Sequence, residues 1–143
     1  MKNLTILTLL LGANLAIAKG PCITINNYSN HNFIIERDPN WDDSSITIDG
    51  IAKEKTLVKQ NQHIKVCSFN ENFDKFGSGI GAQGLFLNNE QGEFRTAFIY
   101  GNYDINTGKV QDKVTISDID GIDELHYRLQ DQTAIFARVE IID

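Results

Sequence analysis

The sequence predicts an all-β fold, either an antiparallel β-sandwich or a small Greek-key barrel of about eight to ten short strands. Apolar and polar residues alternate over short runs rich in Ile, Val and Phe, which is typical of strands that bury one face. Asn, Asp, Ser and Gly separate these runs and favour tight turns. The 143 residues, with 19 Ile and 8 Phe, are enough for one folded domain.

The N-terminus has the pattern of a cleavable signal peptide over residues 1–18. Lys2 supplies a positive charge, residues 4–15 are mainly apolar, and Ala16-Ile17-Ala18 offers small residues for cleavage. The apolar run is shorter than the roughly 20 residues that a transmembrane helix needs, and no later run qualifies. We therefore expect residues 19–143 to form a single secreted or periplasmic domain without a transmembrane segment.

Both cysteines, Cys22 and Cys67, follow the expected cleavage site. Oxidising compartments preserve disulfides, and the sequence has no C-x-x-C pair that would indicate a metal or redox site. We therefore expect a Cys22–Cys67 disulfide. Each cysteine falls on the strand face opposite the aliphatic row, so the bridge should lie on an outer face or at an edge.

The two-residue period appears in seven runs, which are residues 23–26, 46–48, 64–66, 85–87, 94–100, 114–116 and 135–141. Four candidate hairpin turns separate them, at Ser29-Asn30, Asp49-Gly50, residues 88–92 and residues 106–108. Two segments fit less well. Residues 70–76 could form one helical turn, and residues 117–129 combine a helical with a strand-like spacing. For the second we favour a loop at 117–123 followed by a strand.

Charge argues against a nucleic-acid partner, because the chain has a net charge of −6 and lacks the basic surface that phosphates require. Positive charge gathers at Lys53, Lys55, Lys59 and Lys65. Lysines in such a run commonly mark an edge strand that is protected from pairing with other chains. The alternative is a patch that contacts anionic lipid or glycan.

Four acidic residues, Asp118, Asp120, Asp123 and Glu124, form the candidate metal site. Ca²⁺ takes six to eight oxygen ligands, and closely spaced carboxylates beside Gly121 could supply several of them. The run lacks the residue order of an EF-hand loop, so the alternative is an acidic turn that binds no metal. Calcium is the one cofactor that the sequence suggests.

Trp41, Asp42, Asp43 and Tyr28 are the candidate ligand-binding residues. A Trp in a polar loop can stack on a sugar or enter a membrane interface, because its ring is apolar with one polar tip. Alternatively, Trp41 folds over the end of the sandwich as a lid.

No catalytic residues can be assigned, because the chain has neither H-E-x-x-H nor G-x-S-x-G. Residues 79–84 match G-x-G-x-x-G, but a strand-like run follows them instead of a helix. We therefore expect a flexible loop there.

The sequence thus predicts a secreted, non-enzymatic module that binds a carbohydrate or a membrane or lipid surface. Binding should use the end loops 38–45, 76–84 and 117–124, because small sandwiches carry function on their loops. The alternative is an inhibitor or other protein partner of a secreted enzyme, for which an acidic surface would suit a basic target. A small secreted hydrolase is the third class.

Overall fold

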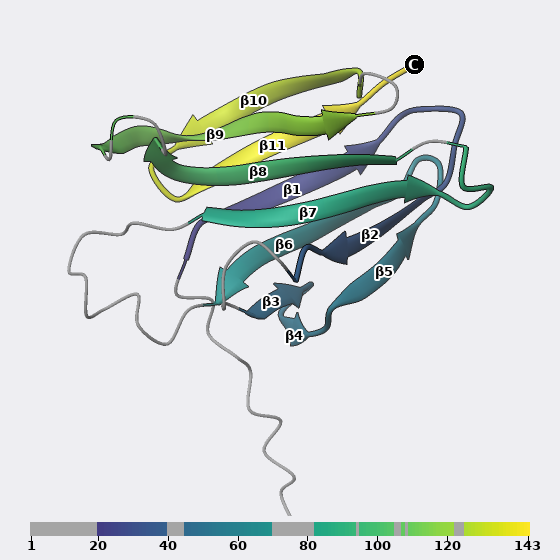
Figure 1. The fold of residues 1–143 in the computed structure, drawn as a ribbon, viewed down its shortest axis with the longest axis horizontal. Helices are drawn as coiled ribbons and strands as arrows, with labels where there is room; N and C mark the ends of the chain where they lie inside the picture. The colour runs from purple at the N-terminus through teal and green to yellow at the C-terminus, as the bar shows by residue number, and fades with distance from the viewer. Residues whose placement is uncertain are drawn as a thin grey trace, which may run out of the picture.

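The computed structural model describes residues 20–39, 45–69, 82–93, 95–104, 107, 109–121 and 125–143. This part of the chain forms eleven strands and no helix (Figure 1). The all-β prediction is therefore confirmed, and the strands outnumber the expected eight to ten by a small margin. None of the described residues belongs to a helix that is long and apolar enough to cross a membrane.

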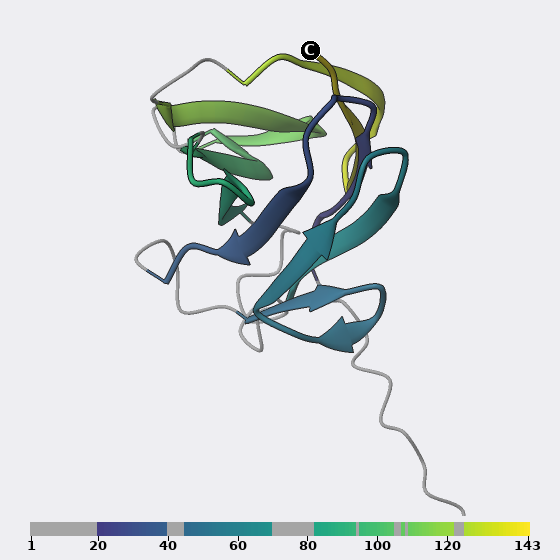
Figure 2. The same cartoon turned by 90° about the vertical axis from the view of Figure 1, so that its right-hand side faces the viewer.

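The strands form two sheets. The six-stranded sheet has the order β10 (Tyr127–Thr133), β11 (Phe136–Ile141), β1 (Cys22–Asn27), β6 (His63–Phe69), β3 (Ser45–Ile48) and β4 (Ile51–Ala52). The five-stranded sheet has the order β5 (Lys55–Val58), β2 (Phe33–Arg37), β7 (Ala82–Asn89), β8 (Arg95–Asp104) and β9 (Lys109–Gly121). The β3–β4 hairpin lies at the opposite end of the molecule from residue 143 (Figures 1 and 2).

Pairing is antiparallel throughout the described sheets except between β1 and β11, which run parallel. A two-residue period reveals a buried face but not the direction of the neighbouring strand, so the sequence could not predict this pair.

The core lies between the sheets and is built from the predicted alternation. In β1, Ile23 and Ile25 are fully buried while the residues between them are half-buried. Phe98 and Tyr100 of β8 fill the other side of the interior. Burial of side chains of this kind contributes roughly 1.5–3 kcal/mol each and is the main stabilising term.

All seven predicted runs coincide with strands, but β2, β4 and β5 were not expected. Two loop predictions were wrong. Residues 117–121 continue β9, where Phe98 pairs with Asp118 and, after a bulge, Ala97 pairs with Asp120. Residues 82–84 begin β7, and Gly84 is buried. The expected helical turn at 70–76 lies outside the described residues.

The Asp49-Gly50 hairpin turn is confirmed. Asp49 has a φ of 51° and Gly50 a φ of 79°, and Ile48 pairs with Ile51 directly across them. Positive φ at both central residues is the type I′ geometry that matches the twist of the flanking strands. Ser29-Asn30, in contrast, connects β1 to β2, which belong to different sheets, so the hairpin prediction there was wrong.

The disulfide joins Cys22 of β1 to Cys67 of β6, which are direct register partners. The aliphatic neighbours of both cysteines point into the core, so the bridge lies on the outer face of the sheet, as the alternation predicted. It fixes β1 against β6 in register.

Candidate functional site

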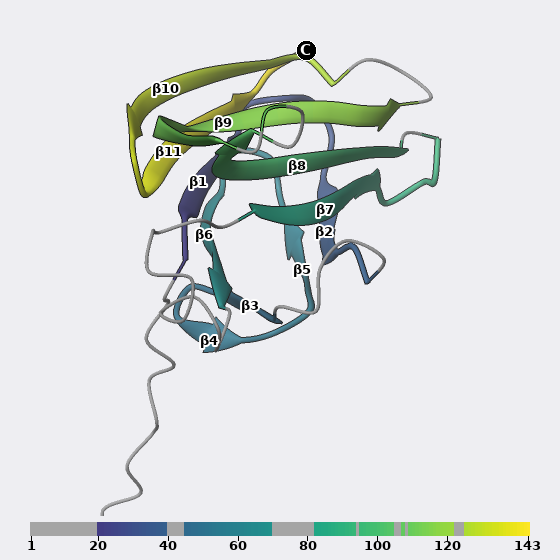
Figure 3. The same ribbon diagram turned by 60° about the vertical axis from the view of Figure 1, so that its left-hand side comes forward.

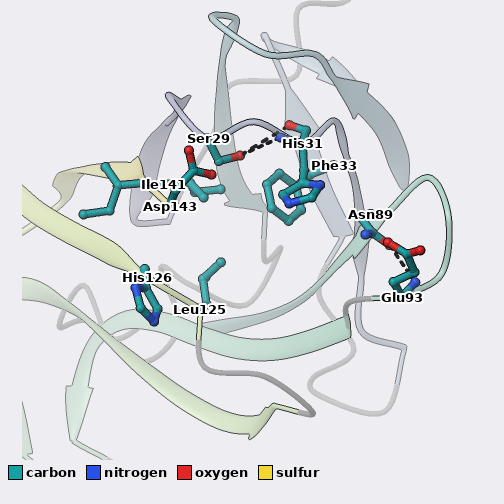
Figure 4. A pocket seen from close by; sticks show the side chains of 10 residues that line it. Ser29, His31, Phe33, Asn89, Glu93, Leu125, His126, Ile141 and Asp143 are labelled. Atoms are coloured by element: carbon teal, nitrogen blue, oxygen red, sulfur yellow. Dashed lines mark hydrogen bonds between the residues drawn. The ribbon is translucent and has the colours of Figure 1, made fainter.

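The described residues line an open cavity of about 330 Å³ at one end of the sandwich. At this end β1, β7 and β11 finish, and β2, β8 and β10 begin. Four chain segments therefore line the cavity: the β1–β2 connection, the β7–β8 turn, residues 125–126 and residues 141–143 (Figure 4). We call this cavity the end pocket.

The floor of the end pocket is apolar. Phe33, Leu125 and Ile141 are buried members of the core cluster. The His31 ring lies edge-on to Phe33, with ring centroids 6.5 Å apart and planes inclined by 72°. The imidazole is exposed, so it extends the aromatic surface from the floor towards the rim.

Asn27 holds the wall that carries His31. Its side chain is fully buried, and its amide nitrogen donates hydrogen bonds to the carbonyl oxygens of His31 at 2.7 Å and Val58 at 3.2 Å. Its amide oxygen accepts hydrogen bonds from the Ser29 backbone N–H at 3.2 Å and the Ser29 hydroxyl at 2.7 Å. One side chain thus fixes the β1–β2 connection in place of a backbone ladder.

Residues 141–143 form a second wall. The Asp143 carboxylate accepts hydrogen bonds from the Asn30 backbone N–H at 2.8 Å and the Asn30 amide group at 2.6 Å. The Ile142 N–H donates to the His126 carbonyl, and the Tyr28 N–H donates to the Ile141 carbonyl. These bonds bring His126 and Asp143 to the rim beside the β1–β2 connection.

The β7–β8 turn supplies the remaining rim. The Asn89 side-chain oxygen accepts a hydrogen bond from the Glu93 backbone N–H at 2.8 Å, and Gly92 has the positive φ of 73° that the turn requires. The turn leaves Glu93 exposed at the rim and Asn89 buried below it (Figure 4).

The rim therefore offers two carboxylates and two imidazoles, with the buried Asn89 amide below them and an apolar floor beneath. Carboxylates accept hydrogen bonds, and the amide both donates and accepts them. In a neutral imidazole, one ring nitrogen donates a hydrogen bond and the other accepts one. The Ser29 hydroxyl donates to the Asn27 amide oxygen and accepts from the His31 backbone N–H. Neither group is a base, so these contacts do not activate the hydroxyl as a nucleophile.

No protein-family model, curated protein or solved structure matches the chain.

The structure describes only part of the predicted ligand-binding set. Tyr28 is 55% exposed and directly precedes the wall residue Ser29, but it does not line the end pocket. Trp41, Asp42 and Asp43 lie outside the described residues.

The predicted calcium residues fall differently. Asp118 and Asp120 belong to strand β9, so the expected acidic loop does not begin before residue 122. Asp123 and Glu124 lie outside the described residues. Among the side chains that the structure describes, no group of three or more His, Cys, Asp or Glu residues could hold a metal ion.

The predicted end loops also leave the sandwich at different ends. Asp38 and Ala82, which flank the loops 38–45 and 76–84, follow β2 and begin β7 at the end away from the end pocket. The third loop leads directly into Leu125 and His126, which line the pocket.

Sequence reasoning missed His31, Glu93, His126 and Asp143 as a group. They come from four separate segments, and no motif or regular spacing links them. The one available signal was the excess of polar residues in the connections at 27–32 and 88–93, where we predicted turns at Ser29-Asn30 and 88–92 and, of the side chains, singled out only Tyr28.

Proposed function

We propose that this protein is a secreted, non-enzymatic binding module that recognises a carbohydrate in its end pocket. The observation that carries the proposal is an apolar floor beneath a rim of carboxylate and imidazole groups in an open cavity of about 330 Å³. Small-ligand sites generally combine an apolar lining with a few convergent polar groups.

A sugar ring suits this combination because it presents C–H groups on its faces and hydroxyl groups around its edge. The hydroxyls would donate to Glu93 and Asp143 and exchange hydrogen bonds with His31. The C–H face would pack on the His31 ring and on Leu125. The volume of about 330 Å³ lies near the lower limit of the roughly 300–1,000 Å³ that is usual for ligand sites.

Charge favours a sugar over a lipid surface at this pocket. Glu93 and Asp143 place two carboxylates at the rim, in a chain whose net charge is −6. The cytoplasmic and bacterial surfaces that attract peripheral proteins are anionic, so they would repel this end of the molecule.

Export is part of the proposal. The Cys22–Cys67 disulfide is compatible with an oxidising compartment, and the signal peptide at residues 1–18 remains a prediction. N-terminal sequencing of the exported protein tests it, because cleavage after Ala18 leaves Lys19 as the first residue. A start at Met1 in the exported protein would contradict it.

Calcium binding by Asp118, Asp120, Asp123 and Glu124 also remains a prediction. A bound ion stabilises the folded state by mass action, so millimolar Ca²⁺ should raise the melting temperature relative to EDTA. An unchanged melting temperature removes calcium from the proposal.

A glycan array probed with the labelled mature protein tests the carbohydrate site. We expect binding to a defined set of glycans and at least a tenfold loss of affinity in Glu93→Gln, which removes a rim charge and leaves the fold intact. Glu90→Gln is the matched control, because Glu90 lies in the same turn but bonds to Asn32 outside the pocket lining.

Three results would overturn the proposal. Equal glycan binding by Glu93→Gln together with its loss in Trp41→Ala would move the site to the loop at the other end. Binding to anionic vesicles without glycan binding would indicate a lipid surface. Capture of a basic secreted hydrolase, with an affinity that falls steeply with salt, would indicate an inhibitor.

A further inference from the structure

A second surface, independent of the end pocket, lies along the free edge of β5. In the part of the chain that the structure describes, β5 has one neighbour in its sheet, β2. β5 and β6 are joined by a tight turn at residues 59–62, but they belong to different sheets and diverge from it (Figure 3). The side of β5 that faces away from β2 therefore ends the sheet.

The register shows which backbone groups face this edge. The Arg37 N–H donates to the Glu54 carbonyl, which makes that pair a hydrogen-bonded one. Hydrogen-bonded and non-hydrogen-bonded pairs alternate along an antiparallel ladder. The pairs Ile35–Thr56 and Phe33–Val58 are therefore also hydrogen-bonded. Lys55 and Leu57 belong to the non-hydrogen-bonded pairs, so their N–H and C=O groups point towards the free edge.

The side chains of the same two residues point to the outer face of the sheet. Leu57 is 39% exposed and lies across from Ile34, and Lys55 lies across from Glu36 at an N–O distance of 3.6 Å. Both side chains of the Lys55–Glu36 pair are more than 40% exposed, so the pair contributes little to stability. Lys55 is therefore available to a second carboxylate. The outer face beside the free edge thus carries an apolar side chain, Leu57, and a cationic one, Lys55.

The surroundings of β5 add positive charge. Lys53 precedes the strand and donates to the Thr56 hydroxyl at 3.0 Å, and Lys59 follows the strand and is exposed. Such lysines oppose pairing with a second copy of β5, since parallel or antiparallel pairing would bring lysines of both copies together. The same charges favour a strand that carries carboxylates.

We propose that the free edge of β5 binds an extended acidic peptide segment of a partner protein by strand addition. The added strand would form hydrogen bonds to the backbone of Lys55 and Leu57, as in other cases of β-augmentation. It would place an apolar side chain beside Leu57 and an acidic one beside Lys55. Further acidic side chains would lie opposite Lys53 and Lys59.

The probe for this proposal is a fluorescent peptide, Glu-Thr-Val-Thr-Glu-Thr-Glu, whose antiparallel pairing sets Val beside Leu57 and the central Glu beside Lys55. We expect it to bind the mature protein and to slow amide hydrogen exchange at Lys55 and Leu57, which face the added strand. Exchange at Thr56 should not change, because its N–H already bonds to β2. Protection of all three amides, or of none, would contradict strand addition.

Two matched comparisons separate the backbone and charge contributions. N-methylation of the peptide at Val and at the central Glu should abolish binding, whereas N-methylation of the intervening Thr should preserve it. Lys55→Glu should weaken binding about tenfold, because an attraction becomes a repulsion. Lys109→Glu, at the opposite edge of the same sheet, makes the same charge change and should have no effect.

Other results would assign the edge differently and overturn the proposal. Lys55-dependent binding to phosphatidylglycerol vesicles without peptide binding would identify a membrane contact. A dimer in sedimentation analysis that Lys55→Glu disrupts would identify a second copy as the occupant. Equal binding of the fully N-methylated and unmodified peptides would show that the backbone edge is not used.

Discussion

Replacement of Asn27 tests whether one buried side chain holds the wall of the end pocket. Asn27→Ala removes four hydrogen bonds, two from the amide nitrogen and two to the amide oxygen. At about 0.5–1.5 kcal/mol net for each bond, the expected loss in the free energy of unfolding is about 2–6 kcal/mol. That is a large share of the roughly 5–15 kcal/mol that stabilises a domain of this size.

Guanidinium denaturation of the mature protein measures this loss, and Asn26→Ala is the matched control. Asn26 precedes Asn27 on the same strand, but it is half-buried on the outer face, so its replacement should change the free energy of unfolding by less than about 0.5 kcal/mol. A loss below about 1 kcal/mol in Asn27→Ala, or equal losses in the two variants, would refute this role for the side chain.

Asn27→Asp sharpens the test because it keeps the shape of the side chain and removes both donors. A carboxylate would then face the carbonyl oxygens of His31 and Val58. Protonation restores one donor, so the folded state should raise the pKa of this Asp. Relative to the wild type, the free energy of unfolding of Asn27→Asp should therefore be highest at low pH and fall as the pH rises above about 4. A flat profile would show that the amide nitrogen does not carry the effect.

Three further predictions concern stability. Replacing Cys22 and Cys67 together by Ala should lower the free energy of unfolding by about 4 kcal/mol for a closed loop of 45 residues, and the variant should no longer respond to reductant in chemical denaturation. Gly50→Ala should lower the free energy of unfolding by about 1 kcal/mol, because the φ of 79° is unfavourable for Ala and no atom crowds the position. Gly50→Asn should lower it by less, and equal effects of the two variants would point to something other than backbone strain. Tyr100→Phe removes a buried hydroxyl that has no hydrogen-bond partner among the described residues, so it should raise the free energy of unfolding by about 1 kcal/mol, and a decrease would reveal a partner. Burial also raises the pKa of Tyr100. Above a pH of about 10 this residue ionises in the unfolded chain but not in the folded one, so the free energy of unfolding of the wild type should fall by up to about 1.4 kcal/mol per pH unit. Alkaline denaturation of Tyr100→Phe should lack this loss.

The sequence predicted strands wherever one face is apolar and the other polar. β1 and β6 show this pattern clearly, and it also placed the two cysteines on the outer face. β2 was missed because Phe33, Ile34 and Ile35 are consecutive apolar residues. Ile34 lies on the outer face beside Leu57, so both faces of that strand are partly apolar.

The end pocket could not be predicted, because its walls depend on contacts between distant residues. Asn30 and Asp143 meet through two hydrogen bonds, and Asn27 reaches Val58 across the two sheets. No local period encodes such contacts. The prediction of a loop at 117–123 was wrong for a related reason. Pairing with β8 extends β9 through an acidic run whose own composition favours a turn.

The parallel β1–β11 pair has a consequence for the order in which the molecule matures. β1 lies between β6 and β11, and β11 is the last strand that the structure describes. During synthesis β1 can therefore pair with β6, and Cys22 can be oxidised with Cys67, well before β11 has left the ribosome or crossed a membrane. Until then one side of β1 remains an open template, and closing it requires a contact across most of the chain, which is characteristic of slow folding. The disulfide would keep β1 and β6 in register until β11 pairs with β1.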